Sequence, residues 1–370
     1  MRKVKLIDVC DVQYGYAFES SLFNEDKFGR QLIRIRDVLR GYSETYTNEK
    51  CSEEYVVNKG DLLVGMDGEF NIAQWKIDGA VLNQRVCKLT PHKGLHKRYL
   101  YYALIDILKK IEERTSFVTV KHLSAKEIKK IEFRLPSIEQ QKEIADRLDK
   151  VVGLIEKRKE QLAELDQLVK SRFIEMFEKE EYKKVTVSSV LNTGFWLMPA
   201  TPEFIVDGEV PYITSKNIKN RTIDFDNVKY ISRAAYKSVS ANRPTQKGDI
   251  LISMIGTLGQ IALIQDDREF YGQNLYLLRL NNAIVNTTYF CEFFNSDTVQ
   301  YKLQGKRNQS TQAYLKANHV EDLILPLPPM ELQEQFATFV EQADKSKFEI
   351  QQSIDKLETL KKSLMQQYFG

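Results

Sequence analysis

The chain has 370 residues, enough for two or three domains, and its 42% hydrophobic and 28% charged residues are ordinary for a folded soluble protein. Its 54 basic and 51 acidic residues give a net charge of +3, so any nucleic-acid binding must depend on local basic patches. No apolar run approaches the roughly 18 residues of a membrane span, and Asp8 and Asp11 interrupt the run that a signal peptide would need. The four cysteines form no CxxC pair, and we expect reduced thiols in a cytoplasmic protein.

The first segment, residues 1–134, shows short strand signals separated by Gly, Asn and Asp. Its main landmark is Lys59-Gly60-Asp61 followed by an apolar run, which is typical of a glycine turn leading into a buried strand. A helical stretch is expected near residues 97–113. Together these features predict a compact α+β domain.

The second segment, residues 135–177, predicts one long helix. It opens with Leu135-Pro136-Ser137, and Ser137 and Gln140 have the spacing of a capping box. Apolar residues then recur in steps of four and three, the 3.5-residue period of a coiled-coil seam. The seam residues are Ile144, Leu148, Val151, Ile155, Leu162, Leu165, Val169 and Met176, with Arg158 and Arg172 in the two remaining positions.

Both segments occur a second time. Residues 178–326 repeat the landmarks of the first domain, with Lys247-Gly248-Asp249 as the glycine turn and a helical stretch near residues 288–303. Residues 327–370 repeat the long helix, with a seam of Phe336, Val340, Ala343, Ile350, Ile354, Leu357, Leu364 and Tyr368, and with Lys347 and Lys361 in the gaps. We expect the two helices to pair as an antiparallel coiled coil, which would relate the two globular domains by a pseudo-twofold axis.

The motifs of several enzyme classes are missing. Gly305-Lys306-Arg307 lacks the first glycine and the hydroxyl residue of a P-loop, and no G-x-G turn for a nucleotide or a methyl donor occurs. Pro328-Pro329 lacks the flanking residues of an amino-methyltransferase motif and is better explained as a helix start. Triplets of the Glu-x-Lys form, such as Glu25-Asp26-Lys27, do not lie on a strand pattern. The sequence therefore does not support catalysis in this chain.

Two groups of residues could in principle hold a metal ion. His92 and His96 have the spacing of a helical metal pair, but Pro91 and Gly94 favour a solvated loop. Asp67, Glu69 and Asp78 could form a carboxylate cluster, but turn positions explain them equally well. We predict no metal site.

Loops rich in amide, hydroxyl and basic side chains lie beside the expected strands, at equivalent places in both halves. Asn and Gln can bond an adenine edge at two points, Arg can do so to guanine, and isolated cations suit phosphates. The structural alternative, that these amides only close turns, stays open for each residue taken singly. The candidate nucleic-acid contacts are Arg34, Arg36, Asn83, Gln84, Arg85, Lys121, His122, Lys216, Asn217, Lys219, Gln273, Asn274, Arg307, Asn308, Gln309, Ser310, Thr311 and Gln312, with the cations at 34, 36, 216 and 219 assigned to phosphates.

The ordered set of motifs resembles the specificity (S) subunit of type I restriction-modification systems over nearly the whole chain. In the first half the resemblance rests on Gly15-Tyr16-Ala17-Phe18, Leu32-Ile33-Arg34-Ile35, Lys59-Gly60-Asp61, Asn83-Gln84, and Leu135-Pro136 followed by Gln140-Gln141. In the second half it rests on Gly208, Pro211-Tyr212-Ile213, the stretch 247–259, Gln273-Asn274, Ser310-Thr311 and the stretch 325–329. Residues 65–71 depart from the pattern, because they are more acidic than their counterparts near residues 256–259.

The resemblance implies a non-catalytic, DNA-binding subunit with two target-recognition domains, each reading one half of a bipartite site in double-stranded DNA. It implies that the paired helices act as a ruler and as a docking surface for two methyltransferase (modification) subunits, and through them for restriction/motor subunits. The cofactors S-adenosylmethionine, ATP and magnesium would belong to those partners, and none to this chain.

Two other classes stay open. A fused DNA-modifying enzyme would need the methyl-donor motif that the sequence lacks. A non-catalytic coiled-coil scaffold, whose globules bind protein or RNA, would show no preference for a two-part duplex site.

Overall fold

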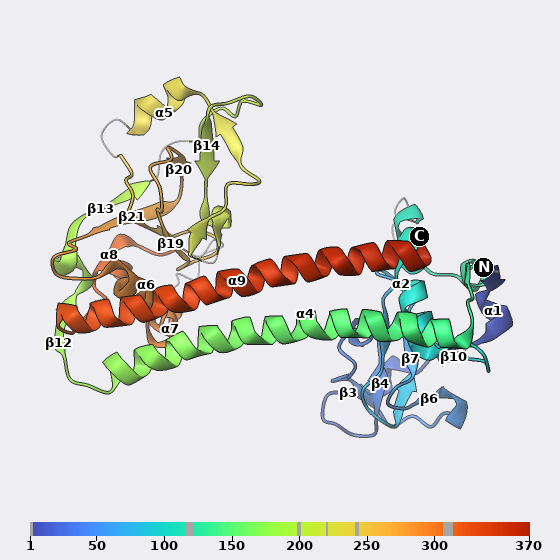
Figure 1. The fold of residues 1–370 in the computed structure, drawn as a ribbon. Coiled ribbons are helices and arrows are strands. Elements are labelled where there is room, and N and C mark those ends of the chain that lie inside the picture. The colour runs from blue at the N-terminus through green and yellow to red at the C-terminus, as the bar shows by residue number, and fades with distance from the viewer. Residues whose placement is uncertain (1–2, 116–120, 198–200, 220, 241–243, 306–313) are drawn as a thin grey trace. The chain divides into compact units, whose positions relative to one another are not determined.

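The structure is a computed structural model that describes the chain except residues 1–2, 116–120, 198–200, 220, 241–243 and 306–313, together with the side chains of residues 239–240. The chain forms two compact units (Figure 1). Unit 1 contains residues 1–159 and 352–370, and unit 2 contains residues 160–351. Each unit therefore combines a globular part with one portion of each of two long helices.

The helices are α1 (Leu6–Val9), α2 (Lys97–Arg114), α3 (Ala125–Ile128), α4 (Ile138–Phe173), α5 (Arg233–Ser240), α6 (Thr287–Asn295), α7 (Asp297–Gly305), α8 (Ala317–Glu321) and α9 (Met330–Phe369). The strands of unit 1 are β1 (Lys3–Lys5), β2 (Cys10–Tyr14), β3 (Phe23–Asn24), β4 (Arg30–Ile33), β5 (Tyr46–Thr47), β6 (Val56–Val57), β7 (Leu62–Gly65), β8 (Ile72–Gln74), β9 (Ala80–Leu82), β10 (Val86–Pro91) and β11 (Glu132–Arg134). Those of unit 2 are β12 (Lys183–Thr186), β13 (Leu191–Leu197), β14 (Val210–Ile213), β15 (Ile218–Lys219), β16 (Thr222–Ile223), β17 (Lys229–Ile231), β18 (Ile250–Ser253), β19 (Ile261–Leu263), β20 (Tyr271–Gly272), β21 (Leu275–Leu280) and β22 (Ile324–Leu327). The helix expected near residues 288–303 is divided into α6 and α7 at Ser296.

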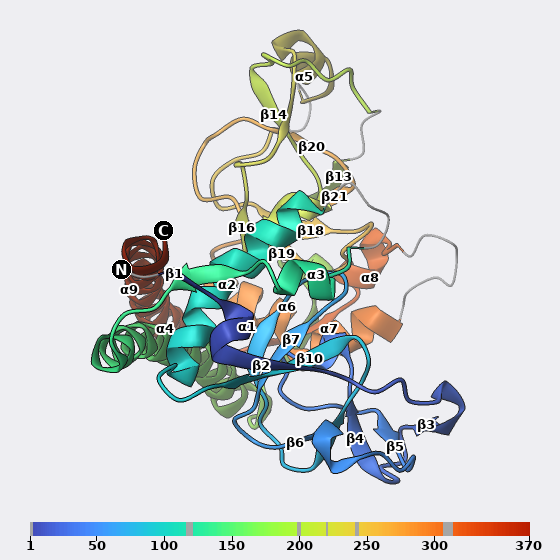
Figure 2. The ribbon, with the colours of Figure 1, turned by 90° about the vertical axis from the view of Figure 1, so that its right-hand side faces the viewer.

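The core of unit 1 contains an antiparallel sheet of order β2-β10-β7-β8, of which β2, β10 and β7 are labelled in Figure 2. Leu62 and Val64 belong to the same apolar cluster as helix α2, whereas Leu63 packs with residues of a second sheet, of order β3-β5-β4-β9-β6. Strand β7 is thus covered on both faces, which explains why its sequence is a continuous apolar run without alternation.

Unit 2 repeats this arrangement. Its main sheet has the order β13-β21-β18-β19, and Ile250 and Ile252 share a cluster with α6 while Leu251 packs on the opposite side. A parallel strand pair accompanies the main sheet in each unit, β4 with β9 and β14 with β20. The α+β class and the internal duplication expected from the sequence are confirmed.

The capping box at the start of the first long helix is confirmed. The Ser137 backbone N–H donates to Gln140 Oε1 at 3.2 Å, and the Gln140 N–H donates to Ser137 Oγ at 3.3 Å. Helix α4 begins at Ile138 and α9 at Met330, each two residues after the proline of the preceding Leu-Pro pair. The residues just before these helices belong to β11 and β22, which pair with the first strands of their units, β1 and β12.

In unit 1 the beginning of α4 packs against the end of α9. Leu148 and Met365 are buried in one cluster with Tyr102 of α2. The Tyr368 hydroxyl accepts a hydrogen bond from Arg147 Nη1 at 3.3 Å, and Lys159 lies 3.9 Å from Glu358. The helices therefore run in opposite directions within this unit, as the two seams predict.

In unit 2 the end of α4 packs against the beginning of α9, again antiparallel. Lys347, which is 18% exposed, contacts Asp166 at 2.7 Å, so this seam cation is neutralised across the pair. The expected seam shifts at the end of α4, where Phe173 and Phe177 are buried while Arg172 is exposed. Phe173 follows the buried Val169 by four residues on the same helix face, and the π-helical turn at Ile174–Glu178 then brings Phe177 into the same core of unit 2.

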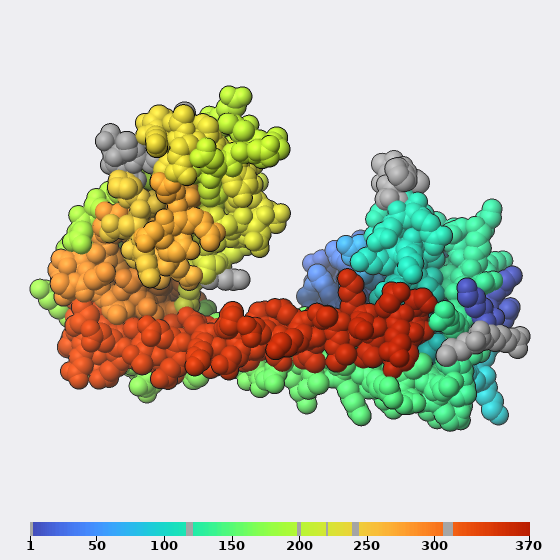
Figure 3. Space-filling model, turned by 45° about the horizontal axis from the view of Figure 1, so that its top comes forward, coloured from blue at the N-terminus to red at the C-terminus, as the bar shows by residue number. Residues whose placement is uncertain are grey.

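The outer side of α9 remains exposed along its length (Figure 3). It carries mainly charged and amide side chains, with Phe348 and Leu360 as apolar exceptions at 64% and 45% exposure. Within the described part of the chain, no helix combines the length and apolarity that crossing a membrane requires.

Candidate nucleic-acid interface

The two glycine turns have the same geometry. Gly60 and Gly248 have φ values of 89° and 92°, a left-handed conformation in which a Cβ would be strained. The Gly60 N–H donates to Trp75 O at 2.8 Å, and that of Gly248 donates to Ile264 O at 2.9 Å. Each turn leads directly into the buried strand β7 or β18, so the residue after each strand is held in a defined place.

A set of backbone bonds, here called the loop frame, gathers three segments at that place. In unit 1 the Met66 N–H donates to Arg85 O at 2.9 Å, and Met66 O accepts from the Leu123 N–H at 2.7 Å. An isolated antiparallel bridge joins Asp67 to His122. The frame therefore brings the two expected loops, residues 83–85 and residues 121–122, together at the end of β7.

Unit 2 has the same loop frame. The Met254 N–H donates to Asn274 O at 3.3 Å, and Met254 O accepts from the Leu315 N–H at 2.8 Å. A bridge joins Ile255 to Tyr314, as one joins Asp67 to His122 in unit 1. Positions 67, 85 and 122 thus correspond to positions 255, 274 and 314.

The side chains of the unit 1 frame meet at Asp67, which is 19% exposed. Its Oδ2 lies 3.3 Å from Arg85 Nε, and its Oδ1 lies 2.5 Å from His122 Nδ1. Arg85 and His122 are 52% and 43% exposed, so both reach the surface while one carboxylate restrains them. Sequence reasoning treated Asp67 only as a turn or metal-cluster residue, because nothing local indicates that its partners come from two distant loops.

Lys121 is restrained from another side. Its Nζ lies 2.8 Å from Glu112 Oε1 on α2, and Glu112 Oε2 accepts the Phe70 N–H at 3.2 Å. The hydrogen bond from Lys121 holds the pKa of the Glu112 carboxyl below its usual value. Lys121 is 31% exposed, so an incoming phosphate would have to share this cation with Glu112.

Asn83 has a local structural role, whereas Gln84 is exposed. Asn83 Oδ1 accepts the Gln84 N–H at 2.8 Å, and Asn83 forms a parallel bridge with Tyr16. A Cβ on Gly15 would lie 2.0 Å from the Asn83 carbonyl oxygen, so glycine is required for this close approach. These contacts favour turn closure for Asn83 and leave Gln84 as the better candidate for contact with a base.

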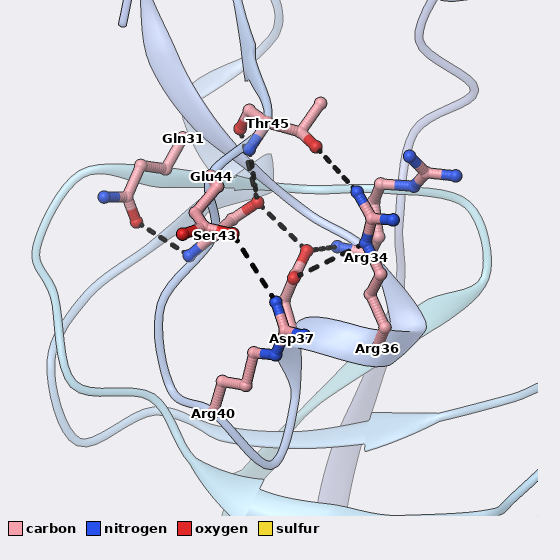
Figure 4. Close-up of polar contacts among 8 residues, drawn as sticks. All are labelled: Gln31, Arg34, Arg36, Asp37, Arg40, Ser43, Glu44 and Thr45. Carbon is pink, nitrogen blue, oxygen red and sulfur yellow. Dashed lines mark hydrogen bonds and ion pairs between the residues drawn. The ribbon is translucent and has the colours of Figure 1, made fainter. Parts of the chain in front are cut away.

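Arg34 and Arg36 lie on a loop fixed by a buried carboxylate (Figure 4). Asp37, only 1% exposed, accepts the Arg34 N–H at 3.0 Å and the Ser43 hydroxyl at 2.9 Å. Arg36 Nη2 donates to Thr45 Oγ1 at 3.3 Å. Arg40, which the sequence analysis did not select, also extends from this loop and lies 3.7 Å from Glu44. The loop therefore presents three arginines on a rigid base.

The corresponding turn of unit 2 carries Lys216, Asn217 and Lys219. Asn217 Oδ1 accepts the Thr214 N–H at 3.0 Å, as Asp37 accepts that of Arg34, and its Nδ2 donates to Asp224 O at 3.2 Å. These bonds favour turn closure for Asn217. Lys216 is exposed, and Lys219 pairs with Asp224 at 2.6 Å.

Gln273 and Asn274 are half-buried at the unit 2 frame. Gln273 Nε2 donates to Thr201 Oγ1 at 3.1 Å, and Gln273 Oε1 accepts the Tyr212 hydroxyl. Asn274 has a φ of 60°, a left-handed conformation that asparagine tolerates better than most residues. The candidate residues Arg307, Asn308, Gln309, Ser310, Thr311 and Gln312 lie outside the described residues.

The two histidines considered for a metal differ in their contacts. His92 Nε2 lies 2.8 Å from Asp11 Oδ1, whereas the backbone N–H of His96 donates to Gln141 Oε1 at 2.8 Å. The buried ring Nδ1 of His96 has no hydrogen-bond partner among the described residues. Across the residues that the structure describes, no group of three or more His, Cys, Asp and Glu side chains is placed to hold a metal ion.

Similar proteins agree with this architecture. The chain is 27% identical to the EcoBI type I restriction enzyme specificity subunit of Escherichia coli, over 99% of this chain and 85% of that protein. It is 27% identical to a putative type I restriction enzyme MjaX specificity subunit of Methanocaldococcus jannaschii, over 43% of this chain and 39% of that protein. The crystal structure of a type I restriction-modification S subunit from M. genitalium has the same fold, with a TM-score of 0.59, 15% identity, and coverage of 100% of this chain and 96% of that one.

The family model for the type I restriction modification DNA specificity domain matches twice, at residues 1–167 and 179–361. Each match contains one copy of the glycine turn and at least part of one loop frame described above. The chain therefore belongs to the family of type I restriction-modification DNA specificity subunits.

Proposed function

We propose that this chain is the sequence-specific DNA-binding subunit of a type I restriction-modification complex, and that each unit reads one half of a bipartite site in double-stranded DNA. The observation that carries the proposal is the duplicated loop frame, in which one backbone arrangement presents different side chains in the two units. A shared scaffold with different surfaces is what a protein needs to read two different half-sites in the same way.

The exposed cations and amides have separate roles in this proposal. Arg34 and Arg36, together with Lys216 and Lys219, contact phosphates, which position the protein without reading sequence. Residues of the loop frame and the neighbouring Gln84 and Gln273 contact base edges. The segment 307–312 remains a predicted contact.

The long helices set the distance between the half-sites and dock the partner subunits. Helix α4 continues for 36 residues without Pro, which corresponds to about 54 Å. Two methyltransferase subunits bind the helices, and restriction/motor subunits assemble through them. The chain itself is non-catalytic and binds no cofactor; S-adenosylmethionine, ATP and magnesium act in the partners.

Methylome sequencing tests this function. A host without restriction-modification systems of its own should receive the chain with its modification subunits. A matched host should receive the modification subunits alone. We expect adenine or cytosine methylation at one motif with two specified halves and a spacer of constant length, in the first host only. A contiguous motif, or methylation that does not depend on this chain, would contradict the proposal, and a scaffold would give no motif.

A second experiment tests the non-catalytic role. The purified chain, free of co-purified subunits, is incubated with the methyl donor and with duplexes that contain the motif found in the methylome. We expect no methyl transfer until the modification subunits are added. Transfer by the chain alone would show that it carries a catalytic site.

A further inference from the structure

We propose that the three frame positions in each unit form a base-reading triad, with Asp67 orienting Arg85 onto a guanine in the half-site read by unit 1. This inference rests on the proposed function. The unit 1 triad is Asp67, Arg85 and His122, and the unit 2 triad is Ile255, Asn274 and Tyr314. Arg85 and Asn274 are the base-contacting members, and Asp67 is a positioning residue.

The triads can be compared residue by residue because the backbone around them is the same. Each unit has a buried methionine at this place, Met66 in unit 1 and Met254 in unit 2. Its backbone N–H donates a hydrogen bond to one loop, and its carbonyl oxygen accepts one from the other loop. The next residue in each unit is bridged to the third member of the triad. The side chains at these positions therefore start from equivalent points, and their chemistry accounts for the difference between the two surfaces.

The unit 1 triad is pre-organised for an arginine contact. Asp67 uses a separate carboxylate oxygen for each partner, at 3.3 Å to Arg85 Nε and 2.5 Å to His122 Nδ1. The contact to Arg85 involves Nε, whereas a guanine O6 and N7 pair is bonded by the two terminal nitrogens of a guanidinium. Restraining a long side chain before binding reduces the entropy that is lost on binding. The contact with Asp67 therefore favours discrimination of guanine from the other bases by Arg85.

Asp67 itself is a poor base reader. It is 19% exposed, and both of its oxygens already have cationic or imidazole partners. A carboxylate in that position would also repel a phosphate if its two partners were removed. Its place in the triad is therefore to fix Arg85 and His122 on the surface.

The unit 2 triad has no charged member. Ile255 stands where Asp67 stands in unit 1, so this position supplies no carboxylate to the neighbouring loops. Asn274 is held instead by its own backbone, with a φ of 60° and a carbonyl bonded to the Met254 N–H. An asparagine amide matches the N6 and N7 edge of adenine. We therefore expect a guanine contact in one half-site and an adenine contact in the other.

A matched Asp–His pair at the other end of strand β10 provides the control. Arg85 precedes strand β10, whereas His92 follows its other end and pairs with Asp11 at 2.8 Å. This second Asp–His pair is 75% and 43% exposed and lies outside the proposed interface. If the contacts of Asp67 were only surface ion pairs, disrupting them would change the methylated motif as little as disrupting the Asp11–His92 pair.

The test compares methylomes of the complete complex carrying Arg85→Gln, Asp67→Asn or His122→Gln with those carrying Asp11→Asn or His92→Gln. The wild-type complex should prefer guanine at one position of one half-site by about tenfold to a hundredfold. Arg85→Gln should abolish that preference, and Asp67→Asn should weaken it. The other half-site and the two control variants should keep the wild-type motif.

The same complex can be tested without mutation, by binding duplexes in which each guanine of the motif is replaced singly by 7-deazaguanine. We expect one guanine, at the position that Arg85→Gln relaxes, to weaken binding by about tenfold. A bipartite wild-type motif that Arg85→Gln leaves unchanged, or guanines that all tolerate the replacement, would overturn the triad while leaving the proposed function intact. A wild-type complex without any bipartite motif would instead overturn the proposed function.

Discussion

The side-chain amide of Gln141 in α4 and that of Gln333 in α9 make the same three hydrogen bonds in the two units. Gln141 accepts the His96 N–H at 2.8 Å and donates to the carbonyls of Gly94 and Pro136. Gln333 accepts the Asn286 N–H at 2.8 Å and donates to the carbonyls of Ile284 and Pro328. Both glutamines are 0% exposed, so each fastens the start of a long helix to the start of the domain helix, α2 or α6.

Replacing Gln141 with Ala is expected to lower the free energy of unfolding of unit 1 by about 2–4 kcal/mol, because each buried polar group left without a partner costs about 1–3 kcal/mol. The chain has two tryptophans, Trp75 in unit 1 and Trp196 in unit 2. Urea unfolding in a Trp196→Phe background therefore reports unit 1 through Trp75. The exposed Gln367→Ala is the control and should change the free energy by less than about 0.5 kcal/mol. Equal midpoints for both variants would show that the buried amide does not fasten the helix.

The cysteines should differ in reactivity. Burial raises the pKa of the Cys10, Cys87 and Cys291 thiols to about 12, so almost no thiolate is present near neutral pH. Burial also raises the pKa of Cys51, but this residue is only partly buried. With a thiol reagent at neutral pH, we expect Cys51 alone to react fast in the native chain. All four cysteines should react after denaturation. Cys51→Ser should remove the fast phase, and a fast phase that persists in that variant would contradict the assignment.

Arg34 and Arg36 are expected to contact phosphates. Replacing either with Gln should weaken binding to specific and non-specific duplexes by a similar factor, because a phosphate contact carries no sequence information. The slope of log K against log salt should become shallower by about 0.9 for each contact removed. Lys3→Gln on β1 is the charge-matched control and should leave the slope unchanged. An effect confined to one DNA sequence would instead indicate a base contact.

Much of the fold follows from patterns that are local in sequence. The capping box at Ser137, the glycine turns at Gly60 and Gly248, and most seam residues are set by backbone geometry and by apolar periodicity. The two helix seams are offset by 192 positions throughout, from Ile144 to Phe336 and from Met176 to Tyr368, which indicated the duplication. The seam was wrong at the end of α4, where Phe173 and Phe177 are buried against the aromatic partners Tyr289 and Phe336. It was also one residue off at Ala145 and Met365, which are buried where the seam named Ile144 and Leu364. Which residue beside a seam position is buried depends on partners from elsewhere in the fold.

The candidate interface was less predictable. Asn217 and Asn83 are of a residue type that commonly contacts bases. Their side chains nevertheless make the hydrogen bonds that close their own turns. Asp67 is of a residue type common in turns, yet its carboxylate contacts both Arg85 and His122. Side-chain direction in a loop depends on which distant loop lies next to it. A single sequence does not contain that information in a local pattern.

The long helices should determine the spacer between the half-sites. Inserting four residues next to Gly153 lengthens α4 by about 6 Å and turns its distal part by about 40°. One base pair rises about 3.4 Å, so the variant should methylate sites with a spacer one or two base pairs longer and with both half-sites unchanged. Gly153→Ala is the control, because a Cβ at this position meets no atom within 4 Å. An active insertion variant with the original spacer would assign the spacing to the partner subunits.

The most direct test of the account is to exchange residues 178–326 for the equivalent segment of a family member that has a different motif, and to sequence the methylome of a host carrying the exchanged chain with its partners. Both units have their own loop frame and their own core. The account predicts that one half of the motif changes to that of the donor, while the other half and the spacer length stay the same. A change in both halves, or none in either, would contradict the claim that each unit reads its own half-site.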